Sequence, residues 1–352
     1  MSIKVGVVGA AGFAGTELVR LILRHPEFEL VAATSNELAG KALSSSYPLL
    51  SGLTDLTYVA HDDDSVADCD VVFLAVPHTA ALKQAPPLLA AGKTVVDLSA
   101  DFRLDDPAVY ESWYQVPHTQ VDLLKERAFG LPELFPDHLE RAREKRMRKE
   151  AVLVGCAGCY PTATSLAAAP AIRGGLLGEG LVVVDAISGV SGAGKKATER
   201  THFCFANENV EAYGVANHRH TPEIEQILDI PGRLVFTPHL APYNRGLLST
   251  VTIPLKDASL TQQDVHALYE DFYRDAMFVK LLPGAAQPKT SSVAGTNLAH
   301  VNVIVNSAVH ALVATCAIDN IGKGAAGQAL QCANIVCGFA ENCGLDLIAV
   351  PA

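Results

Sequence analysis

Two cysteines three positions apart, Cys156 and Cys159, are the residues whose types and spacing most directly suggest chemistry. They follow a short apolar run, 151–154, that is typical of a strand. They precede residues 162–172, which are rich in Ala and Leu and predict a helix. Cys159 therefore lies at a strand-to-helix turn, with Pro161 in the first helical turn. The positive end of the helix dipole favours a thiolate there, so we expect Cys159 to be a nucleophile.

A nucleophilic thiol needs a base, and imidazole is its usual partner. Among the twelve histidines, His218 and His220 stand out because they flank Arg219 in a polar turn. The same two histidines with Cys156 and Cys159 would also make a Cys₂His₂ zinc set, although the H-x-H spacing is not that of a zinc finger. Zinc and an inhibitory disulfide between the two cysteines stay open as lesser alternatives. For Cys156, a buried and inert thiol is the simplest interpretation.

A glycine-rich turn lies near the beginning of the chain. Residues 3–8 are a β-branched run typical of a buried strand, and residues 16–24 show the periodicity of a helix. Between them stand Gly9, Gly12 and Gly15, with G-x-x-G-x-x-G spacing. Absent side chains let backbone N–H groups and the helix N-terminus approach a pyrophosphate. We therefore predict a dinucleotide site at this turn.

The second predicted strand, 29–34, ends without the acidic residue that would hold the ribose of NAD. It continues into Thr34, Ser35 and Asn36, with Lys41 a little further on. Short hydroxyl and amide groups together with a lysine suit a 2′-phosphate better. We therefore predict NADP(H) rather than NAD(H) as the cofactor.

Further strands are predicted at 71–76 and 94–99, separated by a helix over 80–90, and this alternation predicts a doubly wound parallel sheet. His78 follows the first of these strands, where open α/β sheets bind ligands, and is either a cofactor contact or a packing residue. The second half of the chain is expected to form a larger sheet and then a long helix. The predicted segments are strands 181–186, 234–236, 248–253, 301–305 and 311–316 and helix 322–339.

A second glycine-rich loop, 188–196, carries hydroxyl groups and the pair Lys195 and Lys196. Such a loop can cradle an anion. It lacks the Gly-Lys-Ser/Thr order of a P-loop, so ATP is not indicated.

Composition narrows the classes of function. A chain of 352 residues is long enough for two domains, and 49% hydrophobic with 18% charged residues indicates a globular protein. A formal net charge of −11 argues against nucleic acid and against an anionic membrane surface as partners. We find no signal peptide and no apolar run of membrane-spanning length, and eight scattered cysteines suit a reducing compartment. We therefore expect a cytoplasmic enzyme.

Several short motifs occur in an order that points to one family. The chain closely resembles the N-acetyl-gamma-glutamyl-phosphate reductases of arginine biosynthesis, which are related to aspartate-semialdehyde dehydrogenase, and the resemblance covers nearly the whole chain. The motifs are 9–15 with Thr16-Glu17-Leu18, Ala100-Asp101-Phe102-Arg103-Leu104, Gly130-Leu131-Pro132-Glu133-Leu134, Gly158-Cys159-Tyr160-Pro161-Thr162, 188–195, 218–224, Asn244-Arg245-Gly246, and Asp319-Asn320 with Lys323-Gly324. The sequence departs from the family at Ala157, which is usually proline, and at Phe129, which is usually tyrosine.

The resemblance implies an α/β fold, with an N-terminal doubly wound Rossmann-type domain plus an α+β dehydrogenase domain with a large mixed sheet. It implies that residues 1–157 with 321–352 bind NADP and that residues 158–320 form a catalytic and dimerisation domain. The implied enzyme is an NADP-dependent acyl-phosphate reductase, that is, a phosphorylating aldehyde dehydrogenase. It would convert N-acetyl-L-glutamyl 5-phosphate to N-acetyl-L-glutamate 5-semialdehyde through a Cys159 thioacyl intermediate and release inorganic phosphate. A homodimer or homotetramer is expected.

The resemblance also implies residue roles. Cys159 would be the nucleophile and His218 the general acid and base, and no metal is implied. The expected cofactor-binding residues are Gly9, Gly12, Phe13, Ala14, Gly15, Thr34, Ser35, His78, Ser191, Gly192 and Asn320. The expected ligands of the substrate's anionic groups are Arg103, Lys195, His220 and Arg245.

Three rival functions stay open at this point. A sister reductase acting on carrier-protein-linked glutamyl or aminoadipyl phosphate would want a basic docking surface, which a chain of net charge −11 provides poorly. An aspartate-semialdehyde dehydrogenase is disfavoured by the His-Arg-His-Thr-Pro stretch at 218–222. A non-catalytic NADP-binding regulator would have no need for both Cys159 and His218.

Overall fold

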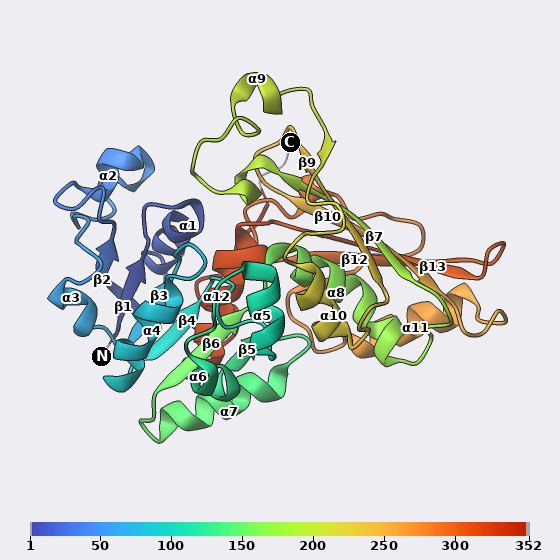
Figure 1. Ribbon diagram of the computed structural model, residues 1–352, viewed down its shortest axis with the longest axis horizontal. Helices are drawn as coiled ribbons and strands as arrows, with labels where there is room; N and C mark the ends of the chain where they lie inside the picture. The colour runs from blue at the N-terminus through green and yellow to red at the C-terminus, as the bar shows by residue number, and fades with distance from the viewer. Residues whose placement is uncertain (1, 350–352) are drawn as a thin grey trace. The chain divides into compact units, whose positions relative to one another are not determined.

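The computed structural model describes residues 2–349 and divides them into two compact units. The first unit contains residues 2–157 and 325–346, and the second contains residues 158–324 and 347–349. Each unit is built on one sheet (Figure 1). No helix within residues 2–349 is long and apolar enough to cross a membrane.

The first unit contains six parallel strands in the order β2-β1-β3-β4-β6-β5. Their bounds are β1 Ile3–Val8, β2 Phe28–Thr34, β3 Val71–Leu74, β4 Thr94–Asp97, β5 Ala128–Gly130 and β6 Val152–Cys156. All residues of β3, β4 and β6 are buried, as expected for inner strands of a parallel sheet. After β1 the chain places β2 on one side of it and then crosses over to place β3 on the other side. The switch point therefore lies at the carboxyl ends of β1 and β3. The predicted doubly wound Rossmann-type sheet is confirmed.

The helices of the first unit connect these strands and include one that returns from the end of the chain. They are α1 Phe13–Ile22, α2 Leu43–Ser46, α3 Asp64–Ala67, α4 Ala81–Ala90, α5 Pro107–Tyr114, α6 Val121–Glu126, α7 Pro136–Met147 and α12 Gly327–Cys337, with the 3₁₀ turn η1 Pro48–Leu50. Helix α12 packs against α7, α1 and β4, and most of its residues are buried. The C-terminal segment therefore completes the core of the N-terminal unit.

The second unit contains a seven-stranded mixed sheet in the order β11-β12-β13-β10-β7-β9-β8. Its strands are β7 Val182–Gly189, β8 Glu211–Ala212, β9 Leu234–Ala241, β10 Leu247–Pro254, β11 Val279–Leu281, β12 Ala299–Asn306 and β13 Ala311–Ile318. Its helical segments are α8 Cys159–Arg173, η2 Val190–Ala193, α9 Phe203–Ala206, α10 Thr221–Leu228, α11 Gln262–Phe272 and η3 Thr290–Ser292, followed by the π-helical turn η4 Gly322–Ala326. The predicted α+β domain with a large mixed sheet is confirmed.

Helix α8 is the core of the second unit. It packs on β10, β12 and β13 and also contacts α10 and α11, and nearly all its residues are buried. On the central strand β10, buried residues alternate with half-buried ones. This alternation is typical of a sheet with one face packed on helices and the other face open.

Three predicted helices had wrong boundaries. Helix α1 spans Phe13–Ile22, where 16–24 was predicted. Helix α8 begins at Cys159, not at Thr162, because the first turn of a helix has no internal N–H partners and therefore accommodates Pro161 at its third position. The predicted continuous helix 322–339 is divided into η4 and α12. In η4, the Gly324 N–H donates to the Asp319 carbonyl at 2.9 Å, a wider π-type turn than an α-helix makes.

Candidate active site

Cys159 is the first residue of α8, directly after Gly158, which caps the helix in an extended conformation with φ −71° and ψ 164°. The Gly158 N–H donates a 2.8 Å hydrogen bond to Oε1 of Glu223, whose side chain is buried. Cys159 is half-buried. The predicted strand-to-helix turn is therefore present, and the N-terminal end of α8 stabilises negative charge at this thiol.

Gly324 leaves the space that the side chain of Cys159 occupies. A Cβ atom at position 324 would lie 2.7 Å from Cβ of Cys159 and 3.2 Å from its Cα. Both atoms are close to the backbone and have no freedom to move aside. The π-helical turn η4 thus packs directly on the first residue of α8, and it does so only with glycine at this position.

His218 lies in a cage of aromatic rings at the same end of α8. Its ring centroid is 5.7 Å from that of Tyr160, 5.4 Å from Tyr213, 5.4 Å from Phe236 and 4.9 Å from His220. Burial, and to a lesser extent the positive charge of Arg219, lowers the pKa of His218 to about 4. The imidazole is therefore neutral at pH 7.

The hydrogen bonding of His218 also assigns its proton. The His220 backbone N–H donates to Nδ1 of His218 at 3.2 Å. An acceptor nitrogen in a neutral imidazole carries no proton, so Nε2 of His218 is the protonated nitrogen. His218 is therefore a hydrogen-bond donor at Nε2.

Two tyrosines link His218 to the cysteine. The Tyr213 hydroxyl donates to the Tyr160 hydroxyl at 3.2 Å, and the Tyr160 hydroxyl donates to the His239 carbonyl at 2.9 Å. Burial raises the pKa of Tyr213 to about 12, and a negative charge on Cys159 acts in the same direction. Cys159, Tyr160, Tyr213 and His218 thus form one cluster, which we call the thiol cluster. Sequence reasoning missed Tyr213, since nothing in its local pattern marks it.

The predicted substrate ligands of the second unit have distinct surroundings. His220 is half-buried, and its ring lies 5.9 Å from that of Tyr160, beside the thiol cluster. The guanidinium of Arg245 contacts Asp319, with Nε 2.8 Å from Oδ2, and the Asp319 side chain is fully buried. Lys195 lies on the exposed loop after η2. Of these three, only His220 is placed by ring contacts beside the thiol cluster.

The second glycine-rich loop and Asn320 lie together, as the resemblance implied. The Asn320 side chain donates to Oγ of Ser191 at 2.9 Å and accepts the Gly246 N–H at 2.7 Å. A Cβ atom at position 192 would lie 2.6 Å from Oγ of Ser188, so Gly192 permits this close packing. Three predicted residues, Ser191, Gly192 and Asn320, are therefore neighbours in the second unit.

Arg103 is buried in the first unit, with 6% of its surface exposed. Its Nε donates to the Cys156 carbonyl and a terminal nitrogen donates to the Leu98 carbonyl, each at 2.7 Å. These bonds join the chain after β4 to the end of β6. The guanidinium therefore holds the backbone immediately before Ala157.

The glycine turn between β1 and α1 suits a bound pyrophosphate. Gly9 has φ +86°, and a Cβ atom there would lie 2.4 Å from the Ala75 carbonyl oxygen; one at Gly15 would lie 2.2 Å from the Gly9 carbonyl oxygen. A Cβ atom at Gly12 would meet only that same oxygen, at 3.6 Å. No side chain caps α1, so the N–H groups of its first turn, which includes Phe13, Ala14 and Gly15, have the arrangement that binds phosphate.

The remaining predicted cofactor residues lie at the carboxyl edge of the same sheet. Thr34 and Ser35 are buried at the end of β2. His78 accepts the Ala100 N–H at Nδ1, at 3.1 Å, and packs edge-on against Tyr114. The adjacent Thr79 has φ +74°, an uncommon conformation for a β-branched residue, and its N–H donates to Asp101 at 2.7 Å.

The zinc alternative gains no support. Within residues 2–349, no group of three or more His, Cys, Asp or Glu side chains is arranged to hold a metal ion. Cys156 is buried, and its sulfur would lie 3.1 Å from a Cβ atom at Gly130, so the thiol packs toward β5. This position agrees with a small hydrophobic side chain.

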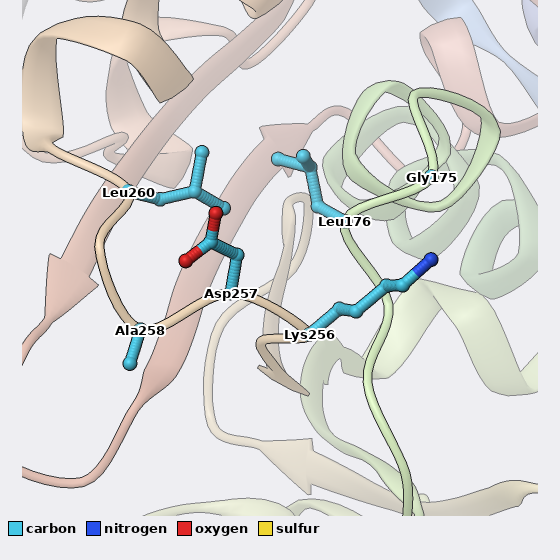
Figure 2. Close-up of a pocket in the computed structure, with 6 residues that line it drawn as sticks. All are labelled: Gly175, Leu176, Lys256, Asp257, Ala258 and Leu260. Atoms are coloured by element: carbon cyan, nitrogen blue, oxygen red, sulfur yellow. The ribbon is translucent and has the colours of Figure 1, made fainter.

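An open hollow on the surface lies away from all these residues. It has a volume of about 430 Å³ and lies in the second unit (Figure 2). Leu176, Asp257 and Leu260 face one another across it, and Lys256 and Asp257 are the only charged residues among the six that line it. None of the predicted site residues contributes to this hollow.

Comparison with known proteins first defines a class. Residues 4–142 match the family model described as the NAD-binding domain of semialdehyde dehydrogenase, and residues 159–320 match that of the semialdehyde dehydrogenase dimerisation domain. The fold is similar to that of aspartate semialdehyde dehydrogenase II from Vibrio cholerae, crystallised with ASA, with a TM-score of 0.71 and 18% identity over 96% of this chain and 98% of that one. The Candida albicans aspartate semialdehyde dehydrogenase, solved with NADP, has a TM-score of 0.72, 17% identity and the same coverage.

Sequence relatives then narrow the class. The N-acetyl-gamma-glutamyl-phosphate reductase of Symbiobacterium thermophilum is 44% identical over 350 residues, covering 98% of both chains. That of Desulforudis audaxviator is 45% identical over 349 residues, covering 97% of this chain and 98% of the relative. The chain therefore belongs to the N-acetyl-gamma-glutamyl-phosphate reductase family, and the family resemblance inferred from the sequence motifs is confirmed.

Proposed function

We propose that the protein reduces N-acetyl-L-glutamyl 5-phosphate to N-acetyl-L-glutamate 5-semialdehyde, with NADPH as the reductant and inorganic phosphate as the second product. The main support for this proposal is the thiol cluster, in which Cys159 begins α8 and a neutral His218 packs on the adjacent Tyr160. The names of the relatives supply the substrate, and the two family models supply the reaction class.

In this proposal one part of the chain binds the cofactor and the other carries the reacting groups. Residues 1–157 with 321–352 bind NADP(H), supported by the glycine turn and the uncapped N-terminus of α1. Residues 158–320 carry the reacting groups and form a homodimer or homotetramer, supported by the description of the matching family model as a dimerisation domain. We also assign the enzyme to the cytoplasm, where thiols such as Cys159 stay reduced.

Cys159 performs the first chemical step. Its thiolate attacks the acyl carbon of the acyl phosphate, a C–S bond forms, the C–O bond to phosphate breaks, and phosphate leaves with the electron pair. The N-terminal end of α8 favours the thiolate and also faces the oxygen on which charge develops. Glu223 and Arg103 act as positioning residues, because their hydrogen bonds fix the backbone at Gly158 and at Cys156.

His218 stabilises the oxygen that gains charge in the second step. Bound NADPH supplies the hydride that this step requires. Nε2–H of the neutral His218 donates a hydrogen bond to the thioester oxygen as that oxygen gains charge, and a thiohemiacetal alkoxide forms on Cys159. The alkoxide then re-forms the C=O bond as the C–S bond breaks, which releases the aldehyde and regenerates the thiolate. The proton on Nε2 in the resting structure agrees with this donor role.

The other predicted site residues are proposed as follows. Arg245, oriented by Asp319, and His220, beside the thiol cluster, bind the anionic groups of the substrate, with Lys195 as a third cation. Ser191, Gly192 and Asn320 lie by the nicotinamide, supported by their mutual contacts. His78 contributes to the edge of the cofactor site by fixing the loop after β3.

The test runs the reaction in reverse. We expect phosphate-dependent reduction of NADP⁺ with N-acetyl-glutamate semialdehyde, and at least about tenfold lower kcat/KM with aspartate semialdehyde. A Cys159→Ala protein serves as the inactive control, with unchanged thermal unfolding as evidence of folding. Absence of turnover with the acetylated aldehyde, or preference for a carrier-protein-linked substrate in the forward direction, would overturn the named substrate.

A further inference from the structure

The hydroxyl group of Thr34 is already used within the protein. Thr34 ends β2 and is 0% exposed. Its Oγ1 accepts the backbone N–H of Gly9 at 3.2 Å and lies 2.5 Å from Nδ1 of His61. The Thr34 hydroxyl therefore links the glycine turn to a histidine.

His61 is held beside the end of β2 by its own segment. Val59 forms a parallel bridge with Thr34, and the Ser35 N–H donates to the Val59 carbonyl at 2.9 Å. The backbone N–H of His61 donates to the side-chain oxygen of Asn36 at 2.9 Å. Three contacts thus fix the imidazole next to the residues that follow β2.

The same contacts determine which nitrogen of His61 faces outward. Thr34 Oγ1 accepts the Gly9 N–H and has a hydroxyl proton that it can donate to Nδ1; we assign the contact this way, which places the proton of the neutral ring on Nε2. No group among residues 2–349 bonds Nε2 of His61. The ring is half-buried, burial lowers its pKa, and the negative charge of Asp62 opposes that shift. His61 therefore presents a preoriented N–H donor.

His61 lies where a doubly wound sheet binds the adenosine part of a dinucleotide. In doubly wound sheets the adenosine ribose is bound at the end of the second strand, beside the glycine turn. Here both Gly9 and Ala10 are tied to Thr34, the second through a 2.9 Å bond from its N–H to the Thr34 carbonyl. The nearest carboxylate in sequence, Glu37, is exposed, so no buried acid is placed to bind a ribose 2′-hydroxyl.

We propose that His61 is a specificity-determining residue whose Nε2–H binds the 2′-phosphate of NADP(H) and disfavours NAD(H). The proposal rests on the function proposed above only in taking NADP(H) as the cofactor. Thr34 acts as the positioning residue that orients this imidazole. Lys41, which is exposed in the segment between β2 and β3, is the alternative phosphate ligand.

The test measures binding and does not need turnover. We would titrate the full-length protein with NADP⁺, NAD⁺ and adenosine 2′-monophosphate by isothermal titration calorimetry. His61→Gln and His61→Phe are expected to weaken NADP⁺ and adenosine 2′-monophosphate at least tenfold and to change the Kd of NAD⁺ less than twofold. His300→Gln, which alters a half-buried histidine in the second unit, is the matched control and should change none of them.

Two further variants distinguish binding of the 2′-phosphate from support of the glycine turn. Thr34→Val removes the hydroxyl but keeps the imidazole, so it should weaken all three nucleotides by disturbing Gly9. Lys41→Ala should leave most of the preference for NADP⁺ intact. Equal weakening of NADP⁺ and NAD⁺ in both His61 variants, or no change in either, would overturn the proposal. Failure of the reductase assay with normal nucleotide selectivity would instead overturn the proposed function alone.

Discussion

Cys159 occupies a position in which the N-terminal end of a helix favours the thiolate. It begins a fifteen-residue helix, and no side chain caps that helix. The His218 ring is neutral, so the resting pair is a thiol or thiolate beside a neutral donor rather than a preformed ion pair. This arrangement assigns the two residues different tasks, attack for the sulfur and hydrogen-bond donation to the developing oxyanion for the ring.

Replacing Cys159 by serine tests the first task. We expect Cys159→Ser to lower kcat by at least about 1,000-fold, because an alkoxide is far harder to form than a thiolate at neutral pH. The measurement is steady-state NADP⁺ reduction with N-acetyl-glutamate semialdehyde and phosphate. Cys204→Ser, which changes the exposed cysteine of α9, should keep full activity. Residual activity above a few per cent in Cys159→Ser would refute the nucleophile assignment.

The pH profile tests the second task. With a pKa of about 4, His218 gains a proton only at acid pH, so its neutral donor form persists as pH falls from 8 to about 5. The kcat/KM profile should therefore have no histidine limb near pH 6.5, the ordinary value for this side chain. A limb at 6.5 that disappears in His218→Gln would contradict this reading.

The same shift of the His218 pKa has a consequence for stability. The unfolded histidine binds a proton near pH 6.5 and the folded one only near pH 4, so the free energy of unfolding falls as pH falls through that window. His218→Gln should lessen this slope, as measured by urea unfolding at pH 7 and pH 5. An unchanged slope would mean that other groups, such as His25 and His138, account for it.

At the scale of elements, the glycines of the first turn have separable roles. Gly15 lets α1 approach the Gly9 carbonyl, whereas Gly12 borders open space. Gly15→Ala should therefore lower stability by at least about 2 kcal/mol, since its Cβ would overlap backbone. Gly12→Ala should cost about 1 kcal/mol or less but weaken NADP⁺ binding at least tenfold. Thermal unfolding and calorimetric titration check the two outcomes, and equal stability losses would contradict the assignment.

The elements also show what sequence alone can supply. Apolar runs predicted the strands of the parallel sheet except β5, because inner strands such as β3 and β6 are apolar throughout. The start of α8 and the π-helical turn η4 were not predicted. Both depend on contacts distant in sequence, namely Glu223 bonding Gly158 and Gly324 packing on Cys159.

The residues of the candidate site also differ in whether the sequence predicts them. Cys159 carries a local pattern, whereas the pattern around Arg219 left two histidines and the family resemblance selected His218. Tyr213 and His61 could not be named from the sequence, because their importance comes from partners far along the chain, Tyr160 and Thr34. Thr34 was expected to contact the cofactor, and that contact stays a prediction; its hydroxyl bonds Gly9 and His61.

At the scale of the whole molecule, the open face of the mixed sheet is the surface we expect an oligomer to cover. Val183 on β7 is 37% exposed and pairs in register with Val235 of β9, which is 41% exposed, and with Thr252 of β10. Val183→Arg should therefore lower the molar mass measured by light scattering after size-exclusion chromatography. Val309→Arg, at an exposed valine in the turn between β12 and β13, should not. The same mass for both variants would exclude this face.

The glycine at position 324 carries one more consequence. The location of the nucleophile depends on a hydrogen atom where any other residue would place carbon. Surveys of enzyme mechanism that replace side chains by alanine look for chemistry that is lost, and they pass over positions where an added methyl group does the damage. In this protein such a survey would identify Cys159 and His218 but not Gly324, the residue whose small size allows Cys159 its position.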